Sequence, residues 1–240
     1  MTRATTLVAM GAAIILGGPA SALAQNTDEM TAFVSIYAGA QPMRRSITAT
    51  DSFPLYDETA TVTSTQRIRN SALFKGAFGY PVASNLAVGG GLSYSGRPGT
   101  ATIEAQLPDP IFYDRVRTVP FDANDLKHTE LGINVSLFYR KALTPKFDLV
   151  FSGGPSFIRV EQEIALVNVP TGATAPAVTK RLENGNAFGV NAGVDGIYDV
   201  SQSLGVGVFV HYMGGKLDLP SVAGMTVGGP QAGVVLRVGF

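Results

Sequence analysis

The chain has 240 residues, no cysteine, and 18 acidic and 18 basic residues, which gives a formal net charge of zero. These values exclude a disulfide framework and thiolate chemistry, and no basic patch predicts a nucleic-acid partner. Charged residues make up only 15% of the chain, whereas about a quarter is usual in soluble domains. The two histidines, His128 and His211, have no paired spacing, so we expect no metal site and no cofactor.

The first 24 residues have the pattern of a cleaved export signal. Arg3 gives a basic start, residues 7–18 form an apolar core, and Ala22 and Ala24 are the small residues that a signal peptidase requires. The apolar core is shorter than the ~20 residues that a membrane-spanning helix needs. We therefore expect a signal peptide over 1–24 and a mature domain over 25–240.

Beyond this signal, apolar residues alternate with small or polar ones, which is the period of a β-strand. In chain order, the alternation predicts eight strands, over residues 30–42, 67–80, 86–95, 130–140, 147 onward, 188–198, 204–212 and 232–240. The first strand does not reveal which of its faces is the apolar one. Pro155 interrupts the fifth, and because proline cannot donate to a strand ladder, we expect a bulge there.

The connections between these strands alternate in length. Four are long, at 44–66, 96–127, 162–183 and 213–229, and three are short, at 81–85, 143–146 and 199–203. A transmembrane barrel has short periplasmic turns and long outer loops in this order. Aromatic residues beside the short turns predict a girdle at the periplasmic face: Tyr80, Tyr139, Phe147, Tyr198 and Phe240.

The sequence therefore predicts an all-β fold, an eight-stranded antiparallel up-and-down transmembrane β-barrel over residues 25–240. Two other folds with alternating strands are less consistent with it. A secreted sandwich has no reason to sort its loops by length. A lipocalin-like barrel has an apolar lining, whereas the inward positions here are rich in Gly, Ser and Asn.

Four ionisable residues are predicted to point into the barrel near its periplasmic end: Arg140, Asp148, Asp195 and Arg237. An unpaired buried charge costs several kcal/mol, so we expect these two cations and two anions to pair. We interpret them as a structural cluster in a barrel whose interior is filled by side chains. Lys75, Glu130 and His211 also point inward, with partners that the pattern does not specify.

The sequence predicts no enzymatic activity. Lipid A deacylases of the outer membrane use a similar small barrel with a His, a Ser and an acidic residue. Neither His128 nor His211 has a serine at the required spacing, and a serine nucleophile needs a base within hydrogen-bond reach.

The longest connection, 96–127, carries the candidate contact residues. Its segments 101–107 and 111–117 look like strand extensions that rise above the membrane. Three aromatic residues lie beside two arginines in this connection, in a combination suited to a protein partner or to lipopolysaccharide phosphates: Phe112, Tyr113, Phe121, Arg115 and Arg117. Alternatively, the aromatic residues pack the loop against itself.

Together these patterns resemble the opacity-protein family of outer-membrane β-barrels, which is related to the barrel of outer-membrane protein A. The resemblance lies in segments such as LAVGGGLSY at 86–94 and VVLRVGF at 234–240. It implies a place in the outer membrane of a Gram-negative bacterium, amid lipid and lipopolysaccharide. It also implies delivery by the barrel-assembly machinery, with terminal Phe240 as the assembly signal.

The resemblance further implies a structural and surface-interaction role, in which long extracellular loops meet an extracellular protein or a host-surface ligand. The alternative is a narrow pore for small solutes, as in outer-membrane protein W-like barrels. A continuous path through the barrel interior would favour the pore.

Overall fold

The structure is a computed structural model that describes residues 30–42, 45–68, 70–168 and 177–240. The predicted signal peptide and its cleavage site lie outside the described residues. Among the described residues there is no helix of sufficient length and apolar character to cross a membrane. The described chain forms twelve strands: β1 (Phe33–Gln41), β2 (Arg45–Leu55), β3 (Glu58–Ile68), β4 (Ser71–Ala83), β5 (Leu86–Gly96), β6 (Gly99–Pro108), β7 (Val116–Leu126), β8 (His128–Thr144), β9 (Phe147–Asn168), β10 (Ala177–Asp199), β11 (Leu204–Leu219) and β12 (Val222–Gly239).

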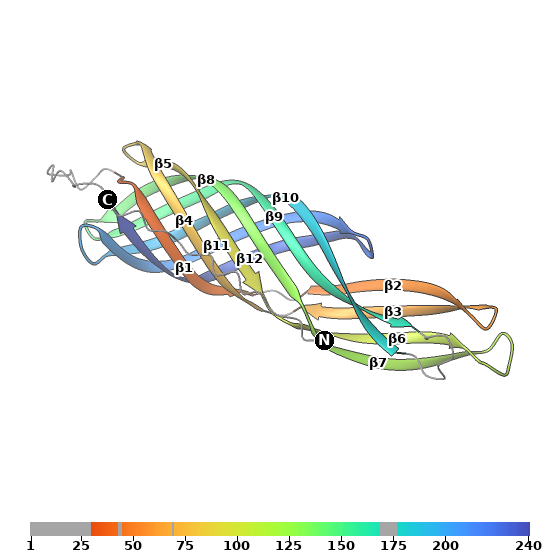
Figure 1. Cartoon of the computed structure of the whole chain (residues 1–240). Coiled ribbons are helices and arrows are strands. Elements are labelled where there is room, and N and C mark those ends of the chain that lie inside the picture. The colour runs from red at the N-terminus through yellow and green to blue at the C-terminus, as the bar shows by residue number, and fades with distance from the viewer. Residues whose placement is uncertain (1–29, 43–44, 69, 169–176) are drawn as a thin grey trace, which may run out of the picture.

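Eight of these strands form a closed barrel in the order β1-β12-β11-β10-β9-β8-β5-β4 (Figure 1). Every pair is antiparallel, and β1 pairs with both β12 and β4, which closes the ring. The predicted eight-stranded antiparallel barrel is confirmed. The alternation of apolar and polar residues predicts these strands correctly because each strand keeps one face toward the barrel interior along its length.

The remaining four strands form a separate sheet in the order β2-β3-β6-β7. This projecting sheet extends beyond one end of the barrel, with its strands running roughly along the long axis of the molecule (Figure 1). Its two hairpins occupy the connections 44–66 and 96–127, which we expected to be loops apart from strand extensions at 101–107 and 111–117. The hairpin β2–β3 is rich in threonine, a β-branched residue that favours strands. Its two strands pair with each other, so the hairpin forms without a strand of the barrel.

The other two long connections are also mostly strand. β9 and β10 pair as far as Asn168 and Ala177, and β11 and β12 pair as far as Leu219 and Val222. The segment 101–107 lies in β6, as an extended segment should. The segment 111–117 instead falls mostly on the turn before β7, so its prediction as a strand extension was wrong.

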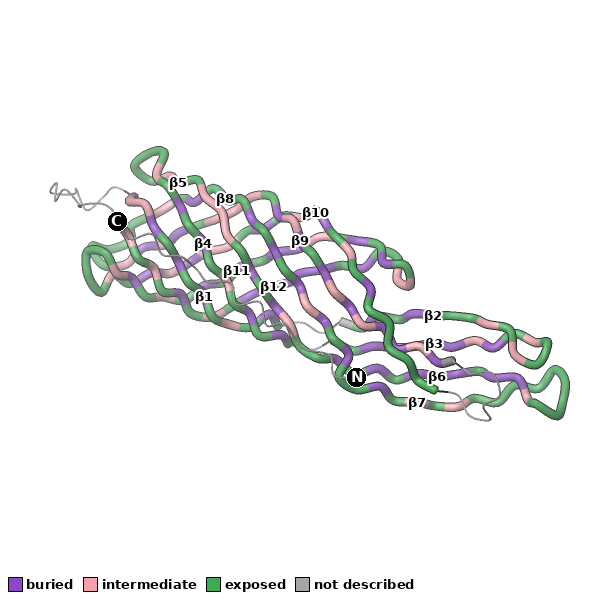
Figure 2. The backbone as a smooth tube through the Cα atoms, viewed as in Figure 1, coloured by how far each residue is buried: buried purple, intermediate pink, exposed green. Residues whose placement is uncertain are grey.

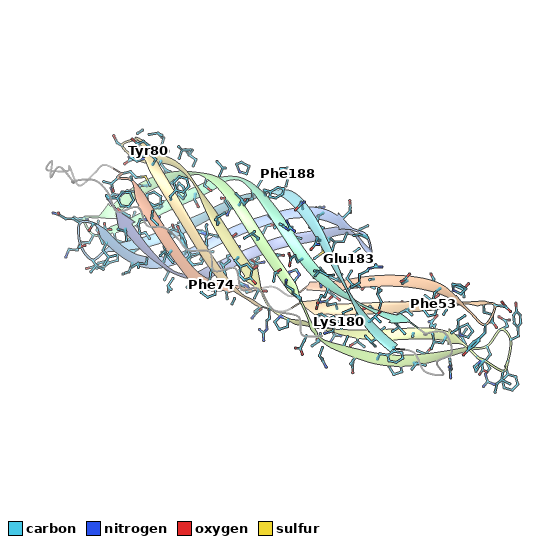
Figure 3. All side chains as sticks on the ribbon, viewed as in Figure 1. Phe53, Phe74, Tyr80, Lys180, Glu183 and Phe188 are labelled. Atoms are coloured by element: carbon cyan, nitrogen blue, oxygen red, sulfur yellow. The ribbon has the colours of Figure 1, made fainter. Side chains whose placement is uncertain are left out.

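Buried and exposed residues alternate along the barrel strands (Figure 2). The exposed positions are mainly apolar, and the buried ones are small, polar, aromatic or aliphatic. Labelled Phe74, Tyr80 and Phe188 point away from the barrel wall (Figure 3), and Phe188 is 84% exposed. In β1, Val34 and Ile36 point outward, which settles the face that the sequence left open. A folded chain in water would bury such a surface, whereas a lipid-facing barrel exposes it to hydrocarbon.

Pro155 does not create a bulge. β9 and β10 keep one register from Phe147 opposite Tyr198 to Asn168 opposite Ala177, and Pro155 lies opposite Val190. Pairing of β9 with β8 lapses beside Pro155 and resumes in the same register. The amide of Asn191 donates to the carbonyl oxygens of Gly154 (2.9 Å) and Pro155 (3.2 Å). The Asn191 side chain therefore provides hydrogen bonds to backbone carbonyls where the pairing of β8 with β9 is interrupted. The strand continues past Pro155 without the extra residue of a β-bulge.

Side chains fill the barrel in two apolar clusters. The one at the short-turn end includes edge-to-face ring pairs, Phe33 with Phe138 (5.2 Å between centroids) and Tyr37 with Phe209 (5.1 Å). The one at the mouth collects inward residues of β9 to β12 around Ile47 from β2. The projecting sheet therefore caps the mouth of the barrel with one of its own side chains.

Candidate functional site

Asp195 on β10 is the centre of a hydrogen-bond network inside the barrel. It is 1% exposed and accepts hydrogen bonds from Tyr37 Oη (2.9 Å) and Arg237 Nη2 (3.0 Å) on Oδ2. His211 Nε2 lies 2.7 Å from its other oxygen, Oδ1. The guanidinium of Arg237 also donates to Ser35 Oγ (3.0 Å). One buried carboxylate thus joins β1, β10, β11 and β12 across the barrel.

Lys75 on β4 extends this network and fixes the tautomer of His211. Its Nζ lies 3.0 Å from His211 Nδ1. A lysine ammonium can only donate, so Nδ1 accepts, and Nε2 carries the proton that is donated to Asp195. Lys75 also lies over the ring of Tyr37, 4.9 Å from its centroid. A chain of donors therefore runs from Lys75 through neutral His211 to Asp195.

The four ionisable residues singled out from the sequence form two pairs. Arg140 Nε lies 2.6 Å from Asp148 Oδ2, and Arg237 lies 3.0 Å from Asp195. The first pair is nearer the short-turn end and more open, with 17% of the Arg140 side chain exposed. The second pair recruits Lys75, His211 and Tyr37. Sequence reasoning put Lys75 and His211 on the inward face but did not connect them with Asp195.

Two further polar groups occupy the interior toward the mouth. Ser136 donates to Asn191 Oδ1 (2.8 Å), and Ser156 donates to Asn134 Oδ1 (2.6 Å). Nearer the mouth is a cluster of amide side chains around Glu130: Gln41 donates to Glu130 Oε2 (2.9 Å), Gln231 donates to Gln41 (3.2 Å), and His128 Nε2 lies 3.3 Å from Glu130 Oε1. The interior is therefore crossed by side-chain contacts at several levels.

This arrangement positions charges but does not assemble a nucleophile. Among the described residues, no group of three or more His, Asp or Glu side chains is arranged to hold a metal ion. His211 contacts Asp195 and Lys75, and His128 contacts Gln162 and Glu130. In this part of the chain no serine is hydrogen-bonded to either imidazole, so the pairing of nucleophile and base is missing.

The loop candidates lie on the projecting sheet, but the structure does not bring all of them together. Phe112 and Tyr113 (82% exposed) occupy the turn between β6 and β7, and the Arg115 guanidinium lies 5.5 Å from the Phe112 ring centroid. Arg117 is exposed at the start of β7. Phe121 is instead partly buried against the core of the sheet. Phe121 is therefore a packing residue and not part of an exposed group.

The projecting sheet is attached to the barrel through apolar and polar contacts. Its core includes Ala165 and Val167 of β9, which extend beyond the barrel wall. Gln162 of β9 donates to Gln66 Oε1 of β3 (2.9 Å), and both side chains are buried. Lys180 of β10 donates to the carbonyl oxygen of Asn124 (2.8 Å) near the end of β7. The extended β9–β10 hairpin therefore supports the sheet.

The opposite face of the sheet is open and carries mainly hydroxyl groups. Threonine and serine side chains lie in cross-strand rows, such as Thr48, Thr65 and Thr102, or Ser52 with Thr61. The alternate residues of the same strands, such as Ile103, point to the inner face of the sheet and are buried. The threonine alternation in 46–65 is the sequence signal for β2 and β3, and it is weak because neither of its faces is strongly apolar.

No protein-family model matches the chain, and no curated protein matches it. Similar solved structures include Ail, the attachment invasion locus protein of Yersinia pestis, at 13% identity and a TM-score of 0.39, covering 87% of this chain and 99% of that one. Neisserial surface protein A has 13% identity and a TM-score of 0.41, covering 87% and 97%. The outer membrane protein OprG from Pseudomonas aeruginosa has 10% identity and a TM-score of 0.44, covering 90% and 97%. At these values the likeness carries no argument about function.

Proposed function

We propose that this chain is a non-enzymatic integral β-barrel protein of the outer membrane of a Gram-negative bacterium, exported by a cleaved signal peptide over 1–24. In this proposal residues 25–240 form the membrane domain, and the projecting sheet is its extracellular interaction surface. Membership of the opacity-protein family is part of the proposal and rests on the sequence patterns at 86–94 and 234–240.

One observation carries this proposal, the inverted polarity of the barrel. Outward positions such as Phe78, Ile133 and Val208 are about half exposed or more, while inward Asp195 and His211 are buried. At ~25 cal/mol per Å² of apolar surface, exposing such a band to water would be strongly unfavourable. Hydrocarbon removes that penalty, and a closed barrel leaves no unpaired strand edge in lipid.

The filled interior supports a scaffold over the narrow pore. The Arg140–Asp148 pair, the Asp195 network and the cluster around Glu130 cross the interior at successive levels. Ile47 of the projecting sheet adds an apolar cap at the mouth. In planar bilayers we expect no stable conductance above that of protein-free membranes.

The tip of the projecting sheet is the part best placed to contact other molecules. Phe112, Tyr113 and Arg115 are exposed there, and Arg117 follows in β7. In the proposed orientation they would meet lipopolysaccharide phosphates, an extracellular protein or a host-surface ligand. At the other end, Phe240 is exposed and its N–H donates to the Ala32 carbonyl oxygen (2.9 Å), so its ring is accessible to the barrel-assembly machinery.

Gel mobility in mild detergent tests whether the barrel is closed, and trypsin digestion tests whether the projecting sheet lies outside the bilayer. The purified protein, refolded in detergent, should migrate faster unboiled than boiled, because a closed barrel resists SDS. Trypsin added to proteoliposomes should cut at Arg115 and Arg117 and leave the strands that bear the apolar band intact. Solubility without detergent, together with no mobility shift, would overturn the proposal in favour of a secreted protein.

A further inference from the structure

The projecting sheet has two open edges, and they differ. β2 and β7 are its outermost strands, and neither has a pairing partner on its outer side in the described part of the chain. An exposed strand edge presents unpaired N–H and C=O groups and therefore tends to pair with another strand. Natural proteins protect such edges with proline, charges, bulges or a covering segment.

β7 carries these protections. Pro120 removes a donor in the middle of the strand, and Asp125 has a positive φ of 56° near its end. The pairing between β6 and β7 shifts register near Gly99. Lys180 of β10 also donates to the carbonyl of Asn124 close by. A partner strand would find this edge irregular and partly occupied.

β2 carries fewer of them, and mostly at its ends. All eleven residues pair with β3 in one continuous register, from Arg45 opposite Ile68 to Leu55 opposite Glu58. Its proline, Pro54, and its charged residue Arg45 lie at the ends of the strand, and the stretch between them, residues 46–53, has one charged residue, Asp51, and no proline. Isoleucine, phenylalanine and threonine give this segment a high strand propensity. The edge of β2 is thus long, regular and nearly uncharged.

We propose that the open edge of β2 pairs antiparallel with β2 of a second copy of this chain, joining two projecting sheets into one. The sequence of β2 is self-complementary about Thr50. A two-fold axis at Thr50 places Thr48 opposite Ser52 on the hydroxyl face, and Ile47 opposite Phe53 on the apolar face. Neither charged residue of β2 falls opposite its own copy, since Asp51 lies opposite Ala49 and Arg45 opposite Leu55. Pro54 lies opposite Ser46, near the end of the paired stretch.

The direction of β2 determines how the two copies are placed. β2 runs outward from the barrel along the long axis of the molecule (Figure 1). Antiparallel pairing therefore puts the two barrels at opposite ends of the joined sheet. This step rests on the proposed membrane location. With both barrels embedded, they lie in two facing membranes, and the contact joins one outer membrane to another.

Because the chain has no cysteine, one introduced cysteine reports this contact directly. Thr50→Cys and the control Thr118→Cys on the β7 edge would be reconstituted into separate phosphatidylcholine vesicles, in short-tagged and long-tagged forms. Opposed residues of an antiparallel pair have Cα atoms about 4.5–5.5 Å apart, within disulfide reach. After mixing and mild oxidation, we expect short–long disulfide dimers with Thr50→Cys and none with Thr118→Cys.

Charge variants test the same contact without a covalent bond. Thr50→Lys and Thr50→Glu each place like charges opposite one another, so vesicles carrying either variant alone should fail to cluster. Mixing Thr50→Lys vesicles with Thr50→Glu vesicles should restore clustering. Vesicles that carry Thr118→Lys should cluster as those with the unaltered chain do. Thr50 is exposed, so these variants retain the gel mobility shift of a closed barrel.

Two results would overturn the β2 contact: no dimers between the two vesicle populations, or clustering that persists in Thr50→Lys alone. If either occurs while the mobility shift is retained, the proposed membrane barrel stands and only the pairing fails. Loss of the mobility shift in the unaltered protein would instead overturn the membrane proposal itself.

Discussion

His211 Nε2 donates to Asp195 Oδ1 over 2.7 Å, although the two residues are diagonal neighbours rather than direct partners. In the ladder between β10 and β11, Asp195 lies opposite Phe209, and His211 lies opposite Gly193. A Cβ at Gly193 would come within 2.0 Å of the His211 ring. The missing side chain therefore leaves the space in which the imidazole lies as it contacts Asp195.

Asp195→Asn should lower the free energy of unfolding by about 3–5 kcal/mol, because it leaves the largely buried Arg237 without its anion. Urea unfolding in detergent or lipid, followed by tryptic digestion or gel mobility, measures this. Asp122→Asn on the exposed face of the projecting sheet is the control and should change stability by no more than about 0.5 kcal/mol. Equal effects of the two substitutions would contradict a structural role for the Asp195 network.

Ile47→Ala should loosen the projecting sheet from the barrel. Ile47 packs into the mouth of the barrel among inward residues such as Met213 and Val227. Truncating a buried isoleucine costs about 2–5 kcal/mol, and here the loss falls on the contact between sheet and barrel. Hydrogen exchange should rise in β2 and β3 and stay unchanged in β11. The control Ile111→Ala, at the exposed tip, should alter neither.

Gly89→Ala should prevent the barrel from closing normally. A Cβ at Gly89 would lie 1.9 Å from the carbonyl oxygen of Phe78, so the backbones of β4 and β5 must separate. Gly76→Ala on β4 is the matched control, since its Cβ would meet nothing within 4 Å. The fraction of protein that shows the gel mobility shift should fall for Gly89→Ala and be retained for Gly76→Ala. A normal shift in both would show that the barrel wall yields easily.

The turn between β6 and β7 should lose order in acid. The backbone N–H groups of Ile111 and Phe112 donate to Asp109 Oδ1, and these bonds hold the pKa of the Asp109 carboxyl below its usual range. A lowered pKa means that the stabilisation is complete above the unfolded value, about 3.9, and is lost as pH falls through the lower folded value. The Ile111 amide resonance should report this titration. Asp109→Ala should accelerate tryptic cleavage at Arg115 at neutral pH.

Phe240→Ala should reduce assembly in a Gram-negative host without impairing refolding in detergent. Phe240 is 69% exposed, so its ring adds little to the packing of the barrel. Outer-membrane fractions should then contain less protein with the mobility shift. Phe188→Ala, at a similarly exposed aromatic position on the barrel wall, is the control and should assemble normally. Equal assembly of both variants would remove Phe240 as the assembly signal.

The barrel was predictable because its signal is local: alternation at Leu131, Ile133 and Val135 predicts a two-faced strand without knowledge of its neighbours. Of the projecting sheet, only the extended segment 101–107 in β6 was predicted, because the length of the connections 44–66 and 96–127 is typical of outer loops. The alternating hydroxyl groups of Thr48 and Thr50 carried the same period with a weaker hydrophobic contrast. An exposed hydroxyl face opposite small residues such as Ala49 gives little apolar signal.

Partners inside the barrel were only partly predictable. Opposite charges near one end predicted pairing, and the structure pairs Arg140 with Asp148 and Arg237 with Asp195. Lys75 and His211 are 136 positions apart in the sequence, and they come into contact only because the barrel closes between β1 and β12. Likewise, the effect of Pro155 depended on Asn191, a side chain from the next strand that satisfies carbonyls beside the lapse. Such contacts depend on three-dimensional closure, which a strand pattern does not specify.

The seam between β1 and β12 sets the order of events during folding. Phe33 pairs with Gly239, near the opposite end of the sequence, so this ladder forms only when the last strand arrives. In the proposed membrane location, both strands would until then present open backbone groups to hydrocarbon, at a cost of several kcal/mol for each unsatisfied group. Intermediates that insert before closure are therefore high in energy. Insertion and ring closure should occur in one concerted step, and spontaneous extraction from the bilayer should be correspondingly slow.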